Sequence, residues 1–292
     1  MNFRENFKNP KYSIPKLFRH LLSNPSMCDT PNHKIVKKLI SDGGVSIRGV
    51  VSNKIISNWL DSYSIFDSNF LPSEGNVTWP FYNNDIHNLL QDSTFMSILD
   101  EYFIKVYGLP PVLQVVPSLV ITKPSIQHDA PILSKKLFPA EWHIDYPGEF
   151  TVHIPLVEIT TEVTHTKYCR GTQYSLMKPK ERLINKNNLF LGTGSPGDVI
   201  MMDVDGWHAA QLKKNSFRAL VQLKFTTGNN LLYSHFDAKK RGGVAKRFFK
   251  SIKDFRGLQS QIKEDYKFLM SVNSKSKYKI LGDNLKYYNN YL

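Results

Sequence analysis

Apolar positions recur with helical spacing along the first third of the chain. Residues 35–40 and 54–63 show the three-to-four-residue spacing of amphipathic helices. Residues 85–107 have the same pattern, with eight apolar side chains on one predicted stripe: Ile86, Leu89, Leu90, Phe95, Ile98, Leu99, Phe103 and Val106. We therefore expect residues 1–110 to form a helical support, with a short strand, that braces one sheet of a β-structure.

The pattern changes to strand spacing in residues 111–228. Runs rich in β-branched and aromatic residues, such as 150–157, 199–203 and 217–225, are separated by Gly, Pro and Ser turn signals. In residues 217–225 the odd positions form an apolar face and the even positions, Arg218, Leu220, Gln222 and Lys224, form the other. This middle region predicts a mainly β fold with flanking helices, built on a double-stranded β-helix (a cupin-like jelly roll).

The last region, residues 229–292, is predicted to be a basic helical extension. The chain has a formal net charge of +13 and a pI near 9.5, and residues 239–256 contain eight basic residues but only one acid, Asp254. One interpretation is an amphipathic helix whose basic face is in water. A surface for an anionic substrate is the alternative, and nucleic acid is disfavoured because no recognised nucleic-acid-binding module accompanies the charge.

Length and composition are compatible with one soluble domain spanning residues 1–292. The 41% hydrophobic content is enough to form a sizeable core. No run of 18 apolar residues is present, and the first residues lack the apolar region of a signal peptide. The two cysteines, Cys28 and Cys169, form no disulfide framework. We expect a cytoplasmic protein without a membrane span, and the oligomeric state is left open.

Three residues form the candidate metal site. His143 and Asp145 are separated by one residue, so in a strand their side chains would lie on the same face. His208, far downstream after the short apolar run 199–203, can complete a set of three ligands. Two histidines and one carboxylate leave positions open on an octahedral Fe(II), whereas structural zinc sites are closed by four protein ligands. The pattern therefore favours a redox-active iron.

The chain contains a second match to the His-x-Asp spacing, at residues 235–237. No histidine follows it to complete a set of three ligands, and it begins a Lys- and Arg-rich segment with helical character. We interpret this second pair as a coincidence on a solvated surface.

Arg218 lies ten residues after His208, on the more polar face of its predicted strand. A guanidinium presents a planar fork that binds a carboxylate through two parallel hydrogen bonds, which lysine cannot reproduce. Near an iron site, the expected ligand of this residue is the distal carboxylate of 2-oxoglutarate, whose 2-oxo acid end would chelate the metal.

Four motifs occur in a fixed order: Trp142-His143-x-Asp145, Pro196-Gly197-Asp198, Trp207-His208 and Phe217-Arg218-Ala219-Leu220. With the Gly-containing segment 40–50, this order across residues 112–228 resembles the phytanoyl-CoA dioxygenase-like family of Fe(II)/2-oxoglutarate-dependent oxygenases. The resemblance implies that His143, Asp145 and His208 bind Fe(II) and that Arg218 binds 2-oxoglutarate. It also implies O2 as co-substrate, hydroxylation of a small organic substrate, and release of succinate and CO2.

Two other classes of protein have the same fold and are kept as alternatives. A cupin-like hydrolase or isomerase would use the metal as a Lewis acid. A non-catalytic jelly-roll protein would bind metal without turnover. The position of Arg218 argues against the first, and the complete ligand set argues against the second.

Several polar residues near the motifs need an interpretation of their own. A lone histidine on a strand, such as His153, is more often a core or surface residue than a site residue. His165 lies in a polar, loop-like segment. Asp203 and Asp205 precede His208 closely, and we expect them to be turn or supporting groups rather than ligands. Cys169 is expected to be a small core residue.

Overall fold

The computed structural model describes residues 33–62, 75–81, 83–92, 94–107, 111–113, 116–124, 142–145, 148–174 and 186–227. The basic extension predicted for residues 229–292 lies outside the described residues, as does the second His-x-Asp pair at 235–237. Among the residues that are described, no helix has the length and hydrophobicity needed to span a membrane.

Among the described residues of the N-terminal region there are four helices, where helices were predicted. They are α3 (His33–Asp42), α4 (Asn53–Ser62), α5 (Asn84–Asp92) and α6 (Thr94–Tyr107). The apolar stripe predicted for residues 85–107 is buried, apart from the partly buried Leu89. It belongs to two helices, because the short polar residues between them favour helix ends over helix interiors. The side chain of Asn83 accepts the N–H of Ile86 at 2.9 Å and so caps α5.

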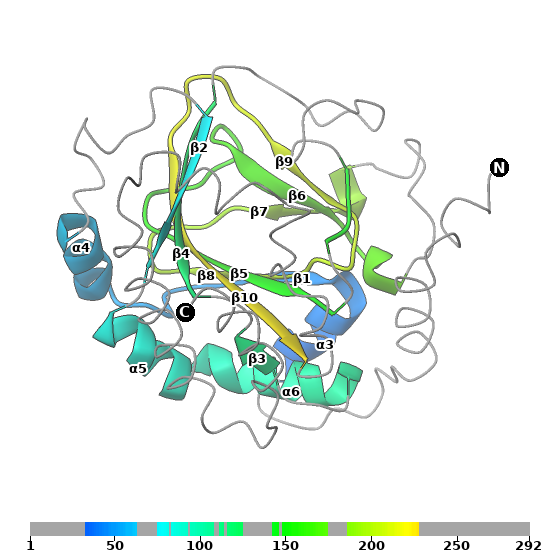
Figure 1. Ribbon diagram of the computed structural model, residues 1–292. Helices are drawn as coiled ribbons and strands as arrows, with labels where there is room; N and C mark the ends of the chain where they lie inside the picture. The colour runs from blue at the N-terminus through cyan, green and yellow to red at the C-terminus, as the bar shows by residue number, and fades with distance from the viewer. Residues whose placement is uncertain are drawn as a thin grey trace, which may run out of the picture.

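The strands form two antiparallel sheets (Figure 1). The large sheet has the order β1-β8-β5-β10-β4-β2, with β3 paired to the far end of β10. Its strands are β1 (Gly44–Ile47), β2 (Gly75–Pro80), β3 (Pro111–Leu113), β4 (Ser118–Lys123), β5 (Phe150–Pro155), β8 (Val199–Asp203) and β10 (Arg218–Thr227). The small sheet has the order β7-β6-β9, with strands β6 (His165–Cys169), β7 (Leu189–Gly192) and β9 (His208–Gln211).

The path of the chain between the two sheets is that of a double-stranded β-helix. After β4 in the large sheet, the segment 142–145 joins the edge of the small sheet through a β-bridge between His143 and His208. The chain then passes through β5 (large), β6 and β7 (small), β8 (large), β9 (small) and β10 (large). This alternation confirms the predicted jelly roll. One prediction was wrong in detail, because residues before 110 contribute two strands, β1 and β2, to the large sheet.

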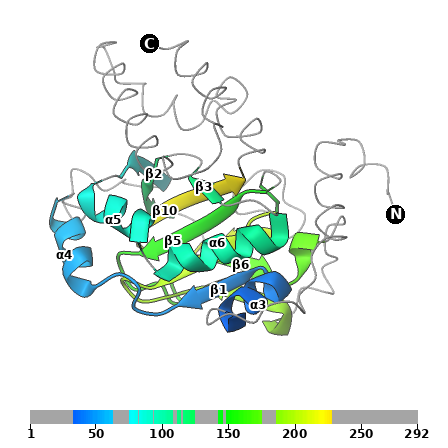
Figure 2. The same ribbon diagram turned by 90° about the horizontal axis from the view of Figure 1, so that it is seen from below.

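The two faces of the large sheet have different neighbours. Helices α3 and α6 lie across its outer face (Figure 2), where they share one buried apolar cluster with the sheet. The outward side chains of β5 and β10 belong to this cluster, including Val152, Ile154, Val221 and Leu223. The opposite face looks toward the small sheet, and this arrangement places the even-numbered residues of β10 inside the β-helix.

Candidate metal centre

The two candidate histidines are held opposite each other by backbone pairing. His143 N donates to His208 O at 2.9 Å, and His208 N donates to His143 O at the same distance. The imidazole rings therefore lie side by side, with centroids 4.3 Å apart. Residues 143–145 were predicted as a strand, but only His143 forms a β-bridge. The chain turns soon after it, at Gly148, whose φ of 74° favours glycine.

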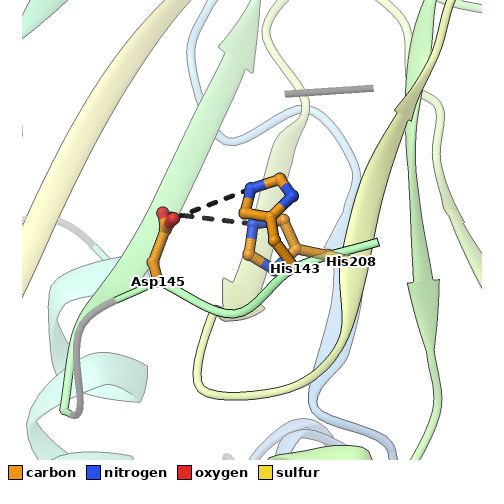
Figure 3. Close-up of side chains that lie close together, drawn as sticks. All are labelled: His143, Asp145 and His208. Carbon is orange, nitrogen blue, oxygen red and sulfur yellow. Dashed lines mark ion pairs between the residues drawn. The ribbon is translucent and has the colours of Figure 1, made fainter. Parts of the chain in front are cut away.

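Asp145 completes the cluster from the segment after the bridge. Its backbone N–H donates to Val204 O at 3.0 Å, which fixes this segment beside the turn between β8 and β9. Its carboxylate faces both imidazoles (Figure 3), with Oδ1 at 3.7 Å from His143 Nε2 and Oδ2 at 4.0 Å from His208 Nε2. The three potential ligand atoms lie within 4.8 Å of one another. The structure thus brings together the three residues that the sequence analysis selected.

These distances fit a single metal ion. Two donors that are each about 2.1 Å from one ion lie roughly 3 Å apart at right angles and roughly 4 Å apart when opposite. Small side-chain movements would bring the three groups into the facial arrangement of a two-histidine, one-carboxylate centre.

The tautomer of His208 is suited to metal binding. Its Nδ1 lies 3.0 Å from the carbonyl oxygen of Gly206. A carbonyl only accepts, so Nδ1 carries the proton and Nε2 presents a lone pair toward Asp145. Gly206 is needed at this position because a Cβ there would lie 1.8 Å from the hydroxyl of Tyr168. The carbonyl that orients His208 therefore comes from a turn that only glycine allows.

Lys224 and Glu149 lie beside the cluster, and sequence reasoning did not select either of them. Lys224 Nζ is 3.7 Å from Asp145 Oδ2 and forms an ion pair with Glu149, whose side chain is 1% exposed. A buried carboxylate of this kind needs a partner, and Lys224 provides one. Strand alternation in residues 217–225 places Lys224 on the same face as Arg218, and this pattern could have indicated that Lys224 lies near the site.

Arg218 lies at the start of β10 with its guanidinium buried. Its Nη2 donates to Thr122 Oγ1 on the neighbouring strand β4 at 3.1 Å. Its buried Nε has no hydrogen-bond partner among the described residues. Burial lowers the pKa of Arg218 to about 10, so the side chain remains charged near neutral pH. A guanidinium offers five N–H donors, and a buried cation with unused donors fits an anionic ligand.

His153 faces the same interior, although a lone histidine on a strand was expected to be a core or surface residue. It lies opposite Gln222 in the β5–β10 register, and its Nε2 is 3.0 Å from Gln222 Nε2. Burial, followed by the positive charges of Arg218 and Lys224 and by His208, lowers the pKa of His153 to about 3. His153 therefore lies on the inner face of the large sheet, beside the strand that carries Arg218 and Lys224.

His165 belongs to strand β6 and is buried, so the prediction of a loop for this residue was wrong. Its Nδ1 lies 2.7 Å from Val163 O. The pKa of His165 is lowered, mainly by burial. Because a local carbonyl uses its Nδ1 proton, its remaining ring nitrogen can only accept a hydrogen bond while the ring is neutral.

The two aspartates before His208 have supporting positions, as the sequence analysis expected. Asp203 accepts a hydrogen bond from Tyr102 of α6, on the outer side of the sheet. Asp205 accepts the N–H of Gly148 through both oxygens, at 2.9 and 3.0 Å. Neither belongs to the candidate metal cluster. Cys169, also as expected, is a buried residue of β6.

No protein-family model matches the sequence, and no curated protein sequence matches it either. Solved structures do show similarity. One is HygX from Streptomyces hygroscopicus with nickel and 2-oxoglutarate bound, which is 11% identical with a TM-score of 0.47, covering 68% of this chain and 88% of HygX. Another is EctD from S. alaskensis with 2-oxoglutarate and 5-hydroxyectoine, which is 14% identical with a TM-score of 0.47. The match covers 71% of this chain and 82% of EctD.

A third similar structure is the non-haem α-ketoglutarate-dependent epimerase SnoN from nogalamycin biosynthesis. It is 13% identical with a TM-score of 0.45, and the match covers 67% of this chain and 82% of SnoN. TM-scores below 0.5 are too low for these similarities to establish the chemistry of this chain. Its assignment therefore depends on its own strands and side chains.

Proposed function

We propose that this chain is a non-haem Fe(II)- and 2-oxoglutarate-dependent oxygenase that hydroxylates an aliphatic carbon of a small organic substrate. One observation carries the proposal. His143, Asp145 and His208 converge within 4.8 Å inside a jelly roll whose interior also contains the buried, incompletely bonded Arg218. A metal-binding face and a carboxylate-binding cation are the two elements that this chemistry requires.

Each residue of the centre has a role that follows from its geometry. His143 and His208 would ligate through Nε2, and the Gly206 carbonyl holds the His208 ring in the required tautomer. Asp145 would supply the single carboxylate ligand. Bound there, Fe(II) supplies the activation of O2 and the oxidation of a nearby C–H bond, which protein side chains cannot perform.

Arg218 would hold the distal carboxylate of 2-oxoglutarate. Its partner Thr122 fixes one edge of the guanidinium, so the remaining donors are already oriented when the ligand arrives. Because the guanidinium is buried, its charge is poorly screened by water, which strengthens the attraction for an anion. The lower pKa, about 10, still leaves the arginine charged at the pH of most cells.

The overall reaction would combine the substrate, 2-oxoglutarate and O2 to give hydroxylated substrate, succinate and CO2. Among enzymes of this class, the order of motifs in residues 112–228 favours a relative of the phytanoyl-CoA dioxygenase-like family. A hydrolase or a non-catalytic metal-binding protein with the same fold would have no need of a buried arginine inside the β-helix, so Arg218 disfavours both.

The test is the O2-dependent conversion of 2-oxoglutarate into succinate by the purified full-length chain, which needs no knowledge of the substrate. We expect slow succinate formation that requires Fe(II) and stops in His143→Ala. His87→Ala, a histidine change on α5 outside the centre, should retain it. Failure of the Fe(II)-loaded parent to form succinate above background, or equal formation by His143→Ala, would contradict the proposal.

A further inference from the structure

His153 has a hydrogen-bond donor that the described residues do not use. Its one hydrogen-bond partner among the described residues is the amide nitrogen of Gln222, at 3.0 Å from Nε2. An amide nitrogen only donates, so Nε2 of His153 is the acceptor and Nδ1 carries the proton. The side chain is 8% exposed, and Nδ1–H has no partner among the described residues. Because no described residue uses this N–H, it is available to an acceptor on a ligand that enters the interior.

The position of His153 relates it to both ends of the candidate site. On β10 the inward residues run from Arg218 through Leu220 and Gln222 to Lys224, and His153 lies across from Gln222. Lys224 contacts Asp145 of the metal cluster, whereas Arg218 lies toward the other end of the strand. A ligand that reaches from the metal cluster to Arg218 therefore passes along the His153–Gln222 pair.

Two other inward residues of β10, Lys224 and Leu220, do not offer a neutral donor. Lys224 is paired with Glu149, and Leu220 packs with Val120 and Ile159. The neighbouring positive charges also help to keep His153 neutral, since its pKa is about 3. The interior therefore offers a neutral N–H donor beside the cationic donors of Arg218.

We propose that His153, oriented by Gln222, is a second anchor for the dicarboxylate that Arg218 binds, and that its Nδ1–H donates to a carboxylate oxygen of that ligand. This inference rests on the proposed function, because it takes 2-oxoglutarate as the dicarboxylate. Gln222 acts as a positioning residue, since its amide fixes the tautomer and the orientation of the imidazole.

The experiment measures binding of 2-oxoglutarate to the Mn(II)-loaded full-length protein by titration calorimetry, and needs no turnover. We expect His153→Phe to weaken 2-oxoglutarate binding about tenfold or more, because it removes a hydrogen bond to a charged group. Gln222→Met should weaken binding by a smaller factor, and in the double variant the two effects should be less than additive. Affinity for Mn(II) should stay within about twofold in all three.

A matched control uses Gln173→Met, which makes the same change at another buried, hydrogen-bonded glutamine. Gln173 donates to Ile40 O and accepts from the Tyr168 hydroxyl, away from β10. This variant should be less stable than the parent but bind 2-oxoglutarate with unchanged affinity. If His153→Phe does not fold, Gln222→Met serves as the test. Methionine is close to glutamine in volume, so this substitution removes only the amide.

The outcomes separate the two proposals. If the Mn(II)-loaded parent does not bind 2-oxoglutarate, the proposed function fails. If the parent binds it and Arg218→Lys weakens binding, but His153→Phe and Gln222→Met both bind as the parent does, the function stands and the second anchor is wrong.

Discussion

The two faces of the large sheet, built from the same strands, have opposite characters. The outer faces of β5 and β10 present Val152, Ile154, Val221 and Leu223 to the helices, in one continuous apolar cluster. The inner faces of these strands present polar side chains, of which His153 is buried and Arg218, Gln222 and Lys224 are half-buried.

The difference suggests that the outer face stabilises the fold and that the inner face forms the candidate site. Burial of apolar area supplies the main free energy of folding, so the outer face carries most of the stabilisation of the sheet. Buried polar groups contribute little net stability and are costly when their hydrogen bonds are incomplete. Under the proposed function, a bound ligand would complete these bonds. Changes on the outer face should therefore affect folding, and changes on the inner face should affect binding.

The largest effect is expected on the outer face. Phe103 of α6 is fully buried and packs against Phe150 of β5, with ring centroids 5.7 Å apart. Phe103→Ala should lower the free energy of unfolding by about 3–5 kcal/mol, because it leaves a cavity in the core. Urea unfolding measures this loss, and Mn(II) affinity of the folded variant should not change. A variant with unchanged stability but impaired metal binding would break the comparison.

The same change, aspartate to asparagine, at one position on each face tests this contrast. Asp145→Asn should weaken metal binding by at least about 100-fold, because a neutral amide replaces the only carboxylate ligand, with a small effect on stability. Asp203→Asn on the outer side should destabilise the protein by about 1–3 kcal/mol, since Asp203 accepts a buried hydrogen bond from Tyr102. Calorimetric titration with Mn(II) and thermal unfolding distinguish the two. Similar metal affinities in both variants would be inconsistent with the assigned ligand set.

Arg218→Lys should weaken 2-oxoglutarate binding by about 10- to 100-fold while metal affinity is retained. Lysine keeps the charge but lacks the planar fork that matches a carboxylate. Thr122→Val, which removes only the hydroxyl that accepts from Arg218, should have a smaller effect in the same direction. Binding to the Mn(II)-loaded variants measures both. Undiminished binding by Arg218→Lys would show that the guanidinium fork is not the recognition element.

Acid should destabilise the metal-free protein through the inner face. His153 has a pKa of about 3 when folded, below the ordinary value of 6.5, so the unfolded chain binds a proton more readily between these values. The contribution of neutral His153 to stability is therefore fully present above pH 6.5. It is lost as the pH falls toward 3. The slope for one group is at most about 1.4 kcal/mol per pH unit.

Urea unfolding of the metal-free parent and of His153→Phe over this pH range isolates the contribution of His153. His165, whose pKa is also lowered, is present in both proteins and cancels in the comparison. We expect a shallower loss of stability in the variant. Parallel pH profiles would mean that His153 is not the neutral buried group described above.

The parts of the site that follow from local pattern could be predicted from the sequence. Strand alternation placed Arg218 on the less apolar face of its strand, and the spacing of His143 and Asp145 marked them as a pair. His208 could be added because it follows a short apolar strand. The jelly roll followed from turn signals between β-rich runs, and topology confirms it.

Other features depend on cross-strand register, which one sequence does not reveal. The pairing of His153 with Gln222 joins residues 69 positions apart, and the ion pair of Glu149 with Lys224 joins residues 75 apart. The convergence of His143 with Asp145 depends on a bridge and the turn after it rather than on the regular strand that was predicted. His165 looked loop-like because its neighbours are polar, yet it is buried in the small sheet.

The most direct test of the central claim is an anaerobic titration of the full-length protein with Fe(II) and 2-oxoglutarate, monitored by visible absorption. Chelation of the iron by the 2-oxo acid produces a weak charge-transfer band. We predict that this band appears in the parent with one equivalent of Fe(II), requires far more 2-oxoglutarate in Arg218→Ala, and is absent in His143→Ala. A parent without the band, or a His143→Ala variant that forms it as readily, would contradict the assignment of this centre.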